Sequence, residues 1–145
     1  MNHSISNYLL KQTCASIACI DNEGFPYSFC CFYVFNPDNG CLYFKSSTVS
    51  MHASFIEAKP QVSGTVLPDK LNKLSIIGVQ FEGICLSEED QNAHGASQFY
   101  HKKNPMALAM PGKVWVIQMN HIKLTDSSLV FGKKMHWNRE ATLAG

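Results

Sequence analysis

The chain has 145 residues, of which 46% are hydrophobic and 16% are charged, and its formal net charge is +1 at pH 7. This length suits one domain, expected over residues 1–145, and it is sufficient to bury a core without disulfides or metals. The near-neutral charge and the lack of a basic patch argue against binding to nucleic acid or to a membrane surface. The small charged fraction favours a large interface between subunits.

Six cysteines are present, and none forms the C-x-x-C pair that zinc sites and thioredoxin motifs use. Four of them lie in apolar, strand-like runs, where a free thiol behaves as a small hydrophobic group. Buried thiols fit a reducing compartment. The first residues show neither a basic segment nor a long apolar stretch, so no signal peptide or transmembrane span is expected. The sequence thus predicts a cytoplasmic protein.

Turn residues and apolar alternation divide the chain into short elements, most of them strands. In chain order the expected elements are a helix over 4–11, strands over 13–20, 26–35 and 41–45, a helix that begins at 51 and is ended by Pro60, strands over 61–67 and 75–86, a helix over 87–103, β-like segments over 113–120 and 122–125, and a last segment over 129–137. Ser87, with Asp90 three residues later, gives the third helix a capping-box-like start. Strands outnumber helices and do not alternate with them, which favours an antiparallel barrel, closed or partly closed.

The strand over 26–35 is apolar on both faces, because Phe29 and Phe35 alternate with Phe32 and Val34. A strand of this kind is covered on both sides. In so small an antiparallel protein, we expect the second cover to be another subunit.

Residues 46–50 form a hydroxyl-rich turn before the helix that begins at Met51. Ser50 is a good N-cap, so the free N–H groups of the first helical turn are expected to point toward the hydroxyls and the imidazole of His52. That arrangement suits a phosphate monoester. An ordinary capped helix after a strand would show the same pattern, so both interpretations stay open.

The strand over 75–86 carries a second candidate position. Ile77, Val79, Phe81 and Cys85 share one face, whereas Gly78, Gln80 and Glu82 share the other. A glycine two residues before Gln80 clears space for a flat ligand, and the Gln80 amide offers both donors and an acceptor to a heterocycle. The alternative is a half-exposed strand whose polar face meets only solvent.

The segment over 131–137 places Lys133, Lys134 and Trp137 close together. A lysine could supply charge to a phosphate or an electron-rich ring, and a tryptophan could stack on it. Alternatively, the segment is a solvated terminus whose Trp137 packs on the barrel. The remaining histidines show no metal-ligand spacing, and neither a serine nucleophile elbow nor a Walker loop is present, so no metal is expected.

Taken in order, these segments resemble the pyridoxamine-5′-phosphate-oxidase-like, FMN-binding split β-barrel superfamily. The resemblance covers about residues 5–137 and includes a D-x-x-G-x-P turn made by Asp21, Gly24 and Pro26. Within that superfamily, the motifs GVQFEG (78–83), IKLTDSSL (122–129) and FGKKMHW (131–137) are similar to those of a small uncharacterised bacterial family ending in FGKKM-x-W. The resemblance implies a mainly β fold with short helices, an antiparallel Greek-key split β-barrel of the FMN-binding type.

The resemblance also implies a homodimer that binds FMN in clefts between its subunits. The cofactor-binding candidates are Ser46, Ser47, Ser50, Met51 and His52 for the phosphate, Gln80 for the flavin ring, and Lys133 and Trp137 supplied by the partner subunit. The superfamily usually has Lys or Arg where this chain has His52. The chain also lacks the further basic residues needed to bind the phosphate of pyridoxamine phosphate, so a different small-molecule substrate is expected.

Two functions follow from this resemblance. The first is a small FMN-dependent oxidoreductase, in which Lys133 would stabilise negative charge on the reduced flavin; no catalytic acid or base is identified. The alternative is a non-catalytic protein that binds or senses flavin or haem on the same dimeric barrel.

Overall fold

The computed structural model describes residues 1–128 and 132–140. The first three residues of the expected last segment, 129–131, lie outside the described residues. The helices and strands are α1 His3–Lys11, β1 Cys14–Ile20, β2 Pro26–Asn36, β3 Cys41–Ser46, α2 Met51–Ala58, β4 Gln61–Val66, β5 Ile77–Cys85, η1 Gln91–Ala93, α3 Ala96–Lys103, η2 Pro105–Ala109, β6 Lys113–Asp126 and β7 Lys133–Asn138.

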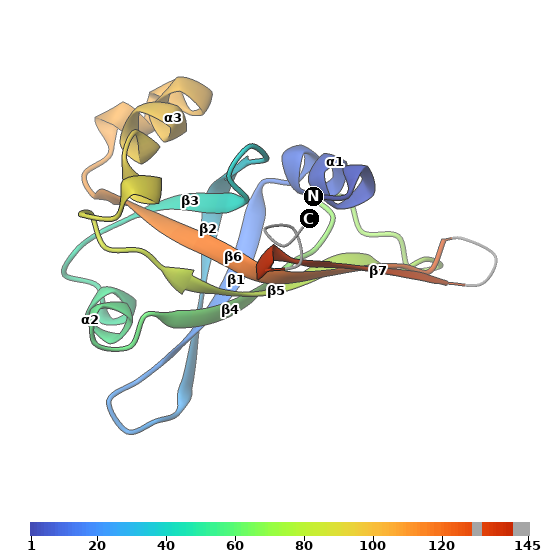
Figure 1. Ribbon diagram of the computed structural model, residues 1–145, viewed down its shortest axis with the longest axis horizontal. Coiled ribbons are helices and arrows are strands. Elements are labelled where there is room, and N and C mark those ends of the chain that lie inside the picture. Colours follow the sequence, from blue (N-terminus) through green and yellow to red (C-terminus); the bar gives the residue numbers. More distant parts are fainter. Residues whose placement is uncertain (129–131, 141–145) are drawn as a thin grey trace.

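Six strands close into an antiparallel barrel. The sheet has the order β3-β2-β1-β4-β5-β6-β7, and a further pairing of β3 with β6 joins its ends. Because β4 returns to pair with β1 after the β1–β2–β3 meander, the connection is a Greek key. Strand β7 pairs with the second half of β6 and extends from the barrel (Figure 1). The predicted fold class is therefore confirmed.

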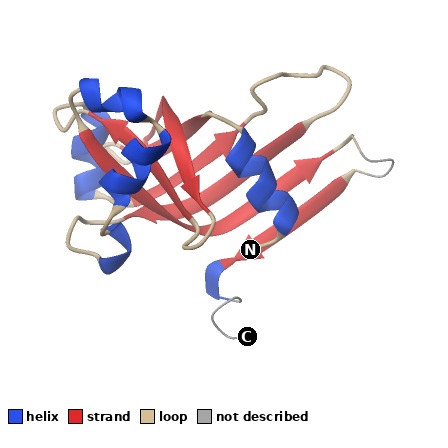
Figure 2. Ribbon diagram, turned by 90° about the horizontal axis from the view of Figure 1, so that it is seen from above, coloured by secondary structure: helices blue, strands red, loops and turns tan. Residues whose placement is uncertain are grey.

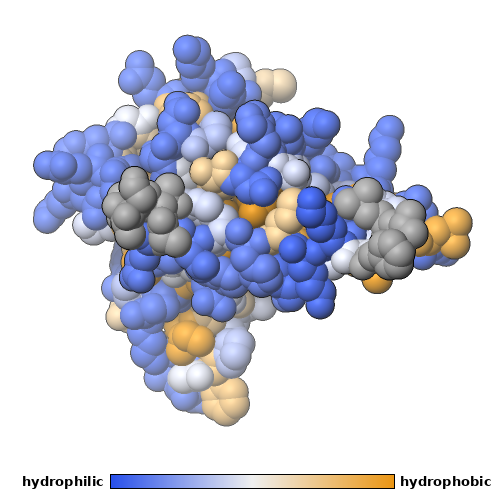
Figure 3. Space-filling model, turned by 45° about the vertical axis from the view of Figure 1, so that its right-hand side comes forward, coloured by the Kyte–Doolittle hydropathy of each residue, from blue (hydrophilic) through white to orange (hydrophobic). Residues whose placement is uncertain are grey.

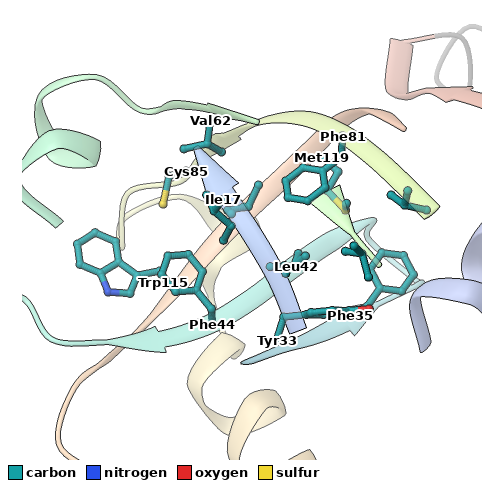
Figure 4. Packing of buried hydrophobic residues seen from close by; sticks show 14 of the residues in the cluster. Ile17, Tyr33, Phe35, Leu42, Phe44, Val62, Phe81, Cys85, Trp115 and Met119 are labelled. Carbon is teal, nitrogen blue, oxygen red and sulfur yellow. The ribbon is translucent and has the colours of Figure 1, made fainter. Parts of the chain in front are cut away.

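The core lies inside the barrel and consists of alternate residues from all six strands. Figure 4 shows Ile17, Leu42 and Phe44 pointing inward together with Phe81 and Met119. Each of these side chains is at most 2% exposed. The predicted two faces of β5 are confirmed, since Val79 and Phe81 are buried whereas Gln80 and Glu82 are exposed.

Helices cover part of the barrel. Figure 2 shows most helical segments gathered at one end of the strands, while α1 lies across them. Helix α1 buries Ile5 and Leu9 in the main core, and α2 buries Phe55 and Ile56 there. Helix α3 instead covers the outer face of β3 and β6, where Tyr100 packs in a second cluster with Val34, Cys41, Tyr43, Ala96 and Val116.

Two predicted boundaries were wrong. The single helix over 87–103 is divided, because Asp90 caps the short η1 and Gly95 adopts φ +76° before α3 begins. The two β-like segments around His121 are one strand, β6, with an irregularity where Glu82 pairs with His121 but Gly83 pairs with Met119. One extra residue, Asn120, therefore bulges from β6 and exchanges the inward and outward positions.

The outer face of β1, β4 and β5 is not covered by a helix. On the neighbouring β2, α3 covers the outer face at Val34, whereas Cys30 is exposed and Phe32 is 68% exposed. The described residues therefore supply the predicted second cover for only part of this strand. The tip of the β1–β2 hairpin extends below the barrel, and Figure 3 shows hydrophobic surface there, where Phe25 is 65% exposed. Among the described residues, no helix has the length and apolar character to cross a bilayer.

Candidate functional site

The end of β3 and the beginning of α2 form the first part of the candidate site. Ser50 is the N-cap of α2, as predicted, and its Oγ accepts a hydrogen bond from the N–H of Ala53 at 3.3 Å. The same hydroxyl donates to the carbonyl of Ser47 at 2.8 Å. Met51 and His52 come before Ala53 in the first turn of α2. Backbone N–H groups at these positions of a helix have no intrahelical acceptor. The turn thus presents the helix N-terminus to solvent.

His52 lies beside the turn in a defined position. Its Nε2 is 2.6 Å from the Oγ of Ser46, and its ring stacks on Phe29 with centroids 3.8 Å apart and planes 9° apart. Burial lowers the pKa of His52 below its ordinary value. Neutral imidazole is therefore favoured near neutral pH, and it can offer a phosphate a hydrogen bond but not a fixed charge.

A cation that the sequence analysis missed is the nearest cross-strand neighbour of this turn. Lys113 on β6 pairs with Ser46 on β3. Its amine is held by Glu88 at 3.0 Å and lies 4.3 Å from the ring centroid of Trp115. The indole N–H of Trp115 donates to the Ser46 carbonyl at 3.2 Å. Only the β3–β6 pairing that closes the barrel brings these residues together, so spacing along the chain gave no signal.

Gln80 lies on the outer face of β5, beside a groove of about 540 Å³. Its neighbours across the sheet are Thr65 on β4 and Lys123 on β6. Gly78 shares this face, and a Cβ placed there would meet no atom closer than 3.6 Å. Space for a flat ligand beside Gln80 is therefore available on this face.

Within one chain the turn and Gln80 do not form a single site. Ser46 pairs with Lys113 and Gln80 pairs with Lys123, at opposite ends of β6. Ten residues of an extended strand follow a path of roughly 33 Å, which is an upper limit for the separation because β6 is bulged at Asn120. The five-carbon chain that joins the phosphate of FMN to its ring is far shorter than this path.

Lys133 and Trp137 lie on the face of β7 opposite to Gln80. Since His136 is the partner of Lys123, residues 134 and 136 share the outer face with Gln80, and residues 133 and 137 face the core side. Trp137 packs against the main core, and Arg139 lies over its ring at 5.3 Å. Its buried indole N–H has no hydrogen-bond partner within the described residues. Within one chain, Trp137 therefore packs on the barrel, which is the second of the two roles considered for it.

The basic side chains that line the groove with Gln80 are Lys123 and His121, and His136 on β7 is the cross-strand partner of Lys123. The Nε2 of His121 is 3.2 Å from the Nδ1 of His136. The sequence analysis found no role for either histidine, because only the pairing of β6 with β7 makes them neighbours. In the described residues, no group of three or more His, Cys, Asp or Glu side chains could hold a metal ion.

Solved structures with this fold include flavin and haem proteins. A haem-binding protein from Mycobacterium smegmatis has a TM-score of 0.76 at 15% identity; the match covers 99% of this chain and 61% of that protein. A pyridoxamine 5′-phosphate oxidase-related, FMN-binding protein from Nostoc punctiforme PCC 73102 has a TM-score of 0.67 at 13% identity, covering 94% of this chain and 88% of that one. At these identities the likeness concerns the fold alone, and it places the chain among split β-barrels.

No protein-family profile matches the chain. A sequence relative, UPF0306 protein YhbP from Salmonella schwarzengrund (strain CVM19633), is 35% identical over 138 residues. That alignment covers 95% of this chain and 93% of the relative. Nearly the whole chain is thus similar at a level that shows common family membership, and the protein belongs to the UPF0306 family of YhbP.

Proposed function

We propose that this protein is an FMN-binding flavoprotein that acts as a small oxidoreductase in the cytoplasm. The observation that carries the proposal is the turn after β3, where Ser46, Ser47 and Ser50 surround the open N-terminus of α2. Hydroxyls and first-turn N–H groups bind a phosphate without a fixed cation. The six free cysteines agree with a reducing compartment.

The proposed cofactor cleft lies between two copies of the chain. In this proposal one subunit binds the phosphate and the other binds the ring through Gln80, which accounts for the separation of Ser46 from Gln80 along β6. Exposed apolar side chains flank the turn: Val49 is 91% and Met51 is 61% exposed. Lys133 and Trp137, assigned to the ring by the resemblance, would have to reach it from the face of β7 opposite to Gln80.

FMN would supply hydride or electron transfer, and the chain's own groups would position it and tune its charge. Ser46, Ser47 and His52 bind the phosphate in this proposal, and Gln80 bonds the heterocycle edge. The substrate differs from pyridoxamine phosphate. The alternative, a protein that only binds flavin or haem, shares the fold of the haem-binding neighbour.

Titration with FMN and with riboflavin tests the proposal. We expect FMN to bind more tightly than riboflavin, because riboflavin lacks the phosphate, and Ser47→Asp to remove that difference by placing a carboxylate in the turn. Reduction of the bound flavin by a nicotinamide donor supports the oxidoreductase. Flavin that no donor bleaches, or haem absorption in the purified protein, favours the binding protein, and no affinity for either ligand contradicts both.

A further inference from the structure

The groove beside Gln80 exists because the residues beneath it have short side chains. It runs over the outer face of β1, β4, β5 and β6. Short side chains form its floor: Ser16, Ala18, Ser28, Ser63 and Thr65. Longer side chains, among them Glu82 and Lys123, line it along β5 and β6. Polar groups therefore line a depression that helices leave open.

Nitrogen donors gather along one side of this groove. Lys123 lies between Gln80 on β5 and His136 on β7 in the sheet register. The rings of His121 and His136 lie 5.5 Å apart, and their nearest nitrogens are 3.2 Å apart. A neutral imidazole has one N–H, so one ring donates to the other. When His136 donates to His121, the remaining N–H of the pair is on Nδ1 of His121, which lines the groove.

The charges that line the groove have no ion-pair partner among the described residues. Among residues 1–128 and 132–140, the only ion pair is that between Lys113 and Glu88. The half-buried Lys123 and the exposed Glu82 thus have no ion-pair partner there. A cation that has lost part of its hydration gains from an anionic partner.

We propose that this groove binds a small molecule with a carboxylate or phosphate group, whose oxygens contact Lys123 and the imidazole N–H of His121. Glu82 and the hydroxyls of the floor accept hydrogen bonds from the rest of the molecule. The proposal that the groove binds an anion depends only on these lining residues and not on the proposed function. Its identification as the site for an anionic substrate rests on the proposed function, because the flavin ring is assigned to the adjacent Gln80.

Calorimetric titration of the full chain tests this site, with sodium pyrophosphate and sodium succinate as probes and with FMN either absent or bound. We expect wild-type protein to bind at least one probe in both states. Lys123→Gln should weaken binding about tenfold or more, because a charge-assisted contact is lost. His121→Ala, which removes the second nitrogen donor that lines the groove, should also weaken it. Lys102→Gln, an exposed lysine on α3, is the charge-matched control and should leave it unchanged.

The probes and variants separate this inference from the proposed function. Binding of pyrophosphate alone identifies a phosphate-bearing ligand, and binding of succinate alone identifies a carboxylate. Pyrophosphate binding that is lost in Ser47→Asp but kept in Lys123→Gln belongs to the turn and overturns the inference. Absence of probe binding to wild type overturns it while leaving FMN binding untouched. If the protein does not bind FMN but binds a probe in a way that depends on Lys123, the groove is a binding site and the proposed function is contradicted. If bound FMN abolishes probe binding, the groove is not a substrate site beside the flavin.

Discussion

His52 shows how one half-buried side chain couples the candidate site to stability. Its ring contacts Ser46 and Phe29, and burial lowers its pKa. In the unfolded chain the imidazole takes up a proton near pH 6.5, whereas in the folded chain it does so only at lower pH. Below about pH 6.5 the unfolded state therefore binds more protons, and stability falls as the pH falls. Above that pH, His52 contributes no such dependence.

This sign gives a direct prediction for His52→Gln, which keeps a polar side chain but cannot titrate. Urea unfolding of wild type should show a loss of free energy of unfolding between about pH 7.5 and about pH 5.5. The variant should lose less over the same interval. Because all other histidines are common to both proteins, their contributions cancel in the comparison. Equal losses in the two proteins would show that His52 titrates alike in the folded and unfolded states.

At this scale the sequence predicts contacts within a turn better than contacts across a sheet. The cap at Ser50 follows from its position before α2 and is confirmed. The faces of Lys133 and Lys134 depend on the register of β7, and a slip of one residue exchanges them. No local pattern fixes that register, so the sequence could not tell which of the two lysines accompanies Gln80.

Among the elements, β4 and β5 pack closely because Gly64 on β4 has no side chain. The ring of Phe81 packs over Gly64, its partner in the register, and fills the space that a Cβ would need. A Cβ at Gly64 would also lie 2.7 Å from the carbonyl oxygen of Ser16 on β1. Three strands would then have to shift to admit one methyl group.

Gly64→Ala should therefore lower the free energy of unfolding by about 1–3 kcal/mol, the usual cost of overpacking. Urea unfolding measures the change. Gly78→Ala is the matched control, since a Cβ there meets its nearest atom at 3.6 Å. That variant should stay near wild-type stability, and a Gly64→Ala protein as stable as the control would mean that Phe81 can move aside.

The elements also show where patterning is limited. Apolar runs bounded by turn residues predicted β1 to β5, and in β5 the alternation also distinguished the inward from the outward face. In β6 the inward positions change from Met119 to Ile122 across the bulge, so the apolar pattern predicts two segments where the structure has one strand. The sequence predicted that Ser87 and Asp90 begin a helix that runs to 103. In the structure Asp90 caps only the short η1. Bulges and short caps depend on partners elsewhere in the fold.

For the whole molecule, barrel closure joins segments that are distant in sequence. The pairing of β3 with β6 aligns Ser46 with Lys113. The barrel class followed from strand content, and its split-barrel identity followed from the resemblance, but no local signal gives this closure. The same closure places the turn and Gln80 at different positions along β6. A cofactor that contacts both would therefore have to lie between two subunits.

A mixing experiment tests the shared cleft directly. Ser47→Asp disables the proposed phosphate turn and Gln80→Leu the proposed ring contact, so each homodimer has two defective clefts. In a hybrid dimer one cleft combines the intact turn of one subunit with the intact Gln80 of the other. After random exchange about half of the dimers are hybrids, each with one functional cleft of two, and FMN binding should return to about a quarter of the wild-type stoichiometry.

The control replaces one partner by the double variant Ser47→Asp/Gln80→Leu. Mixed with Ser47→Asp, it leaves every cleft with a defective turn, so no binding should return. The readout is flavin retained by the protein after gel filtration, whose elution also reports the size of the particle. Recovery in the first mixture but not in the control requires that the two surfaces meet across a subunit interface. A monomeric protein that binds FMN would contradict the shared cleft, because the roughly 33 Å of β6 between the two surfaces would then have to be spanned within one chain.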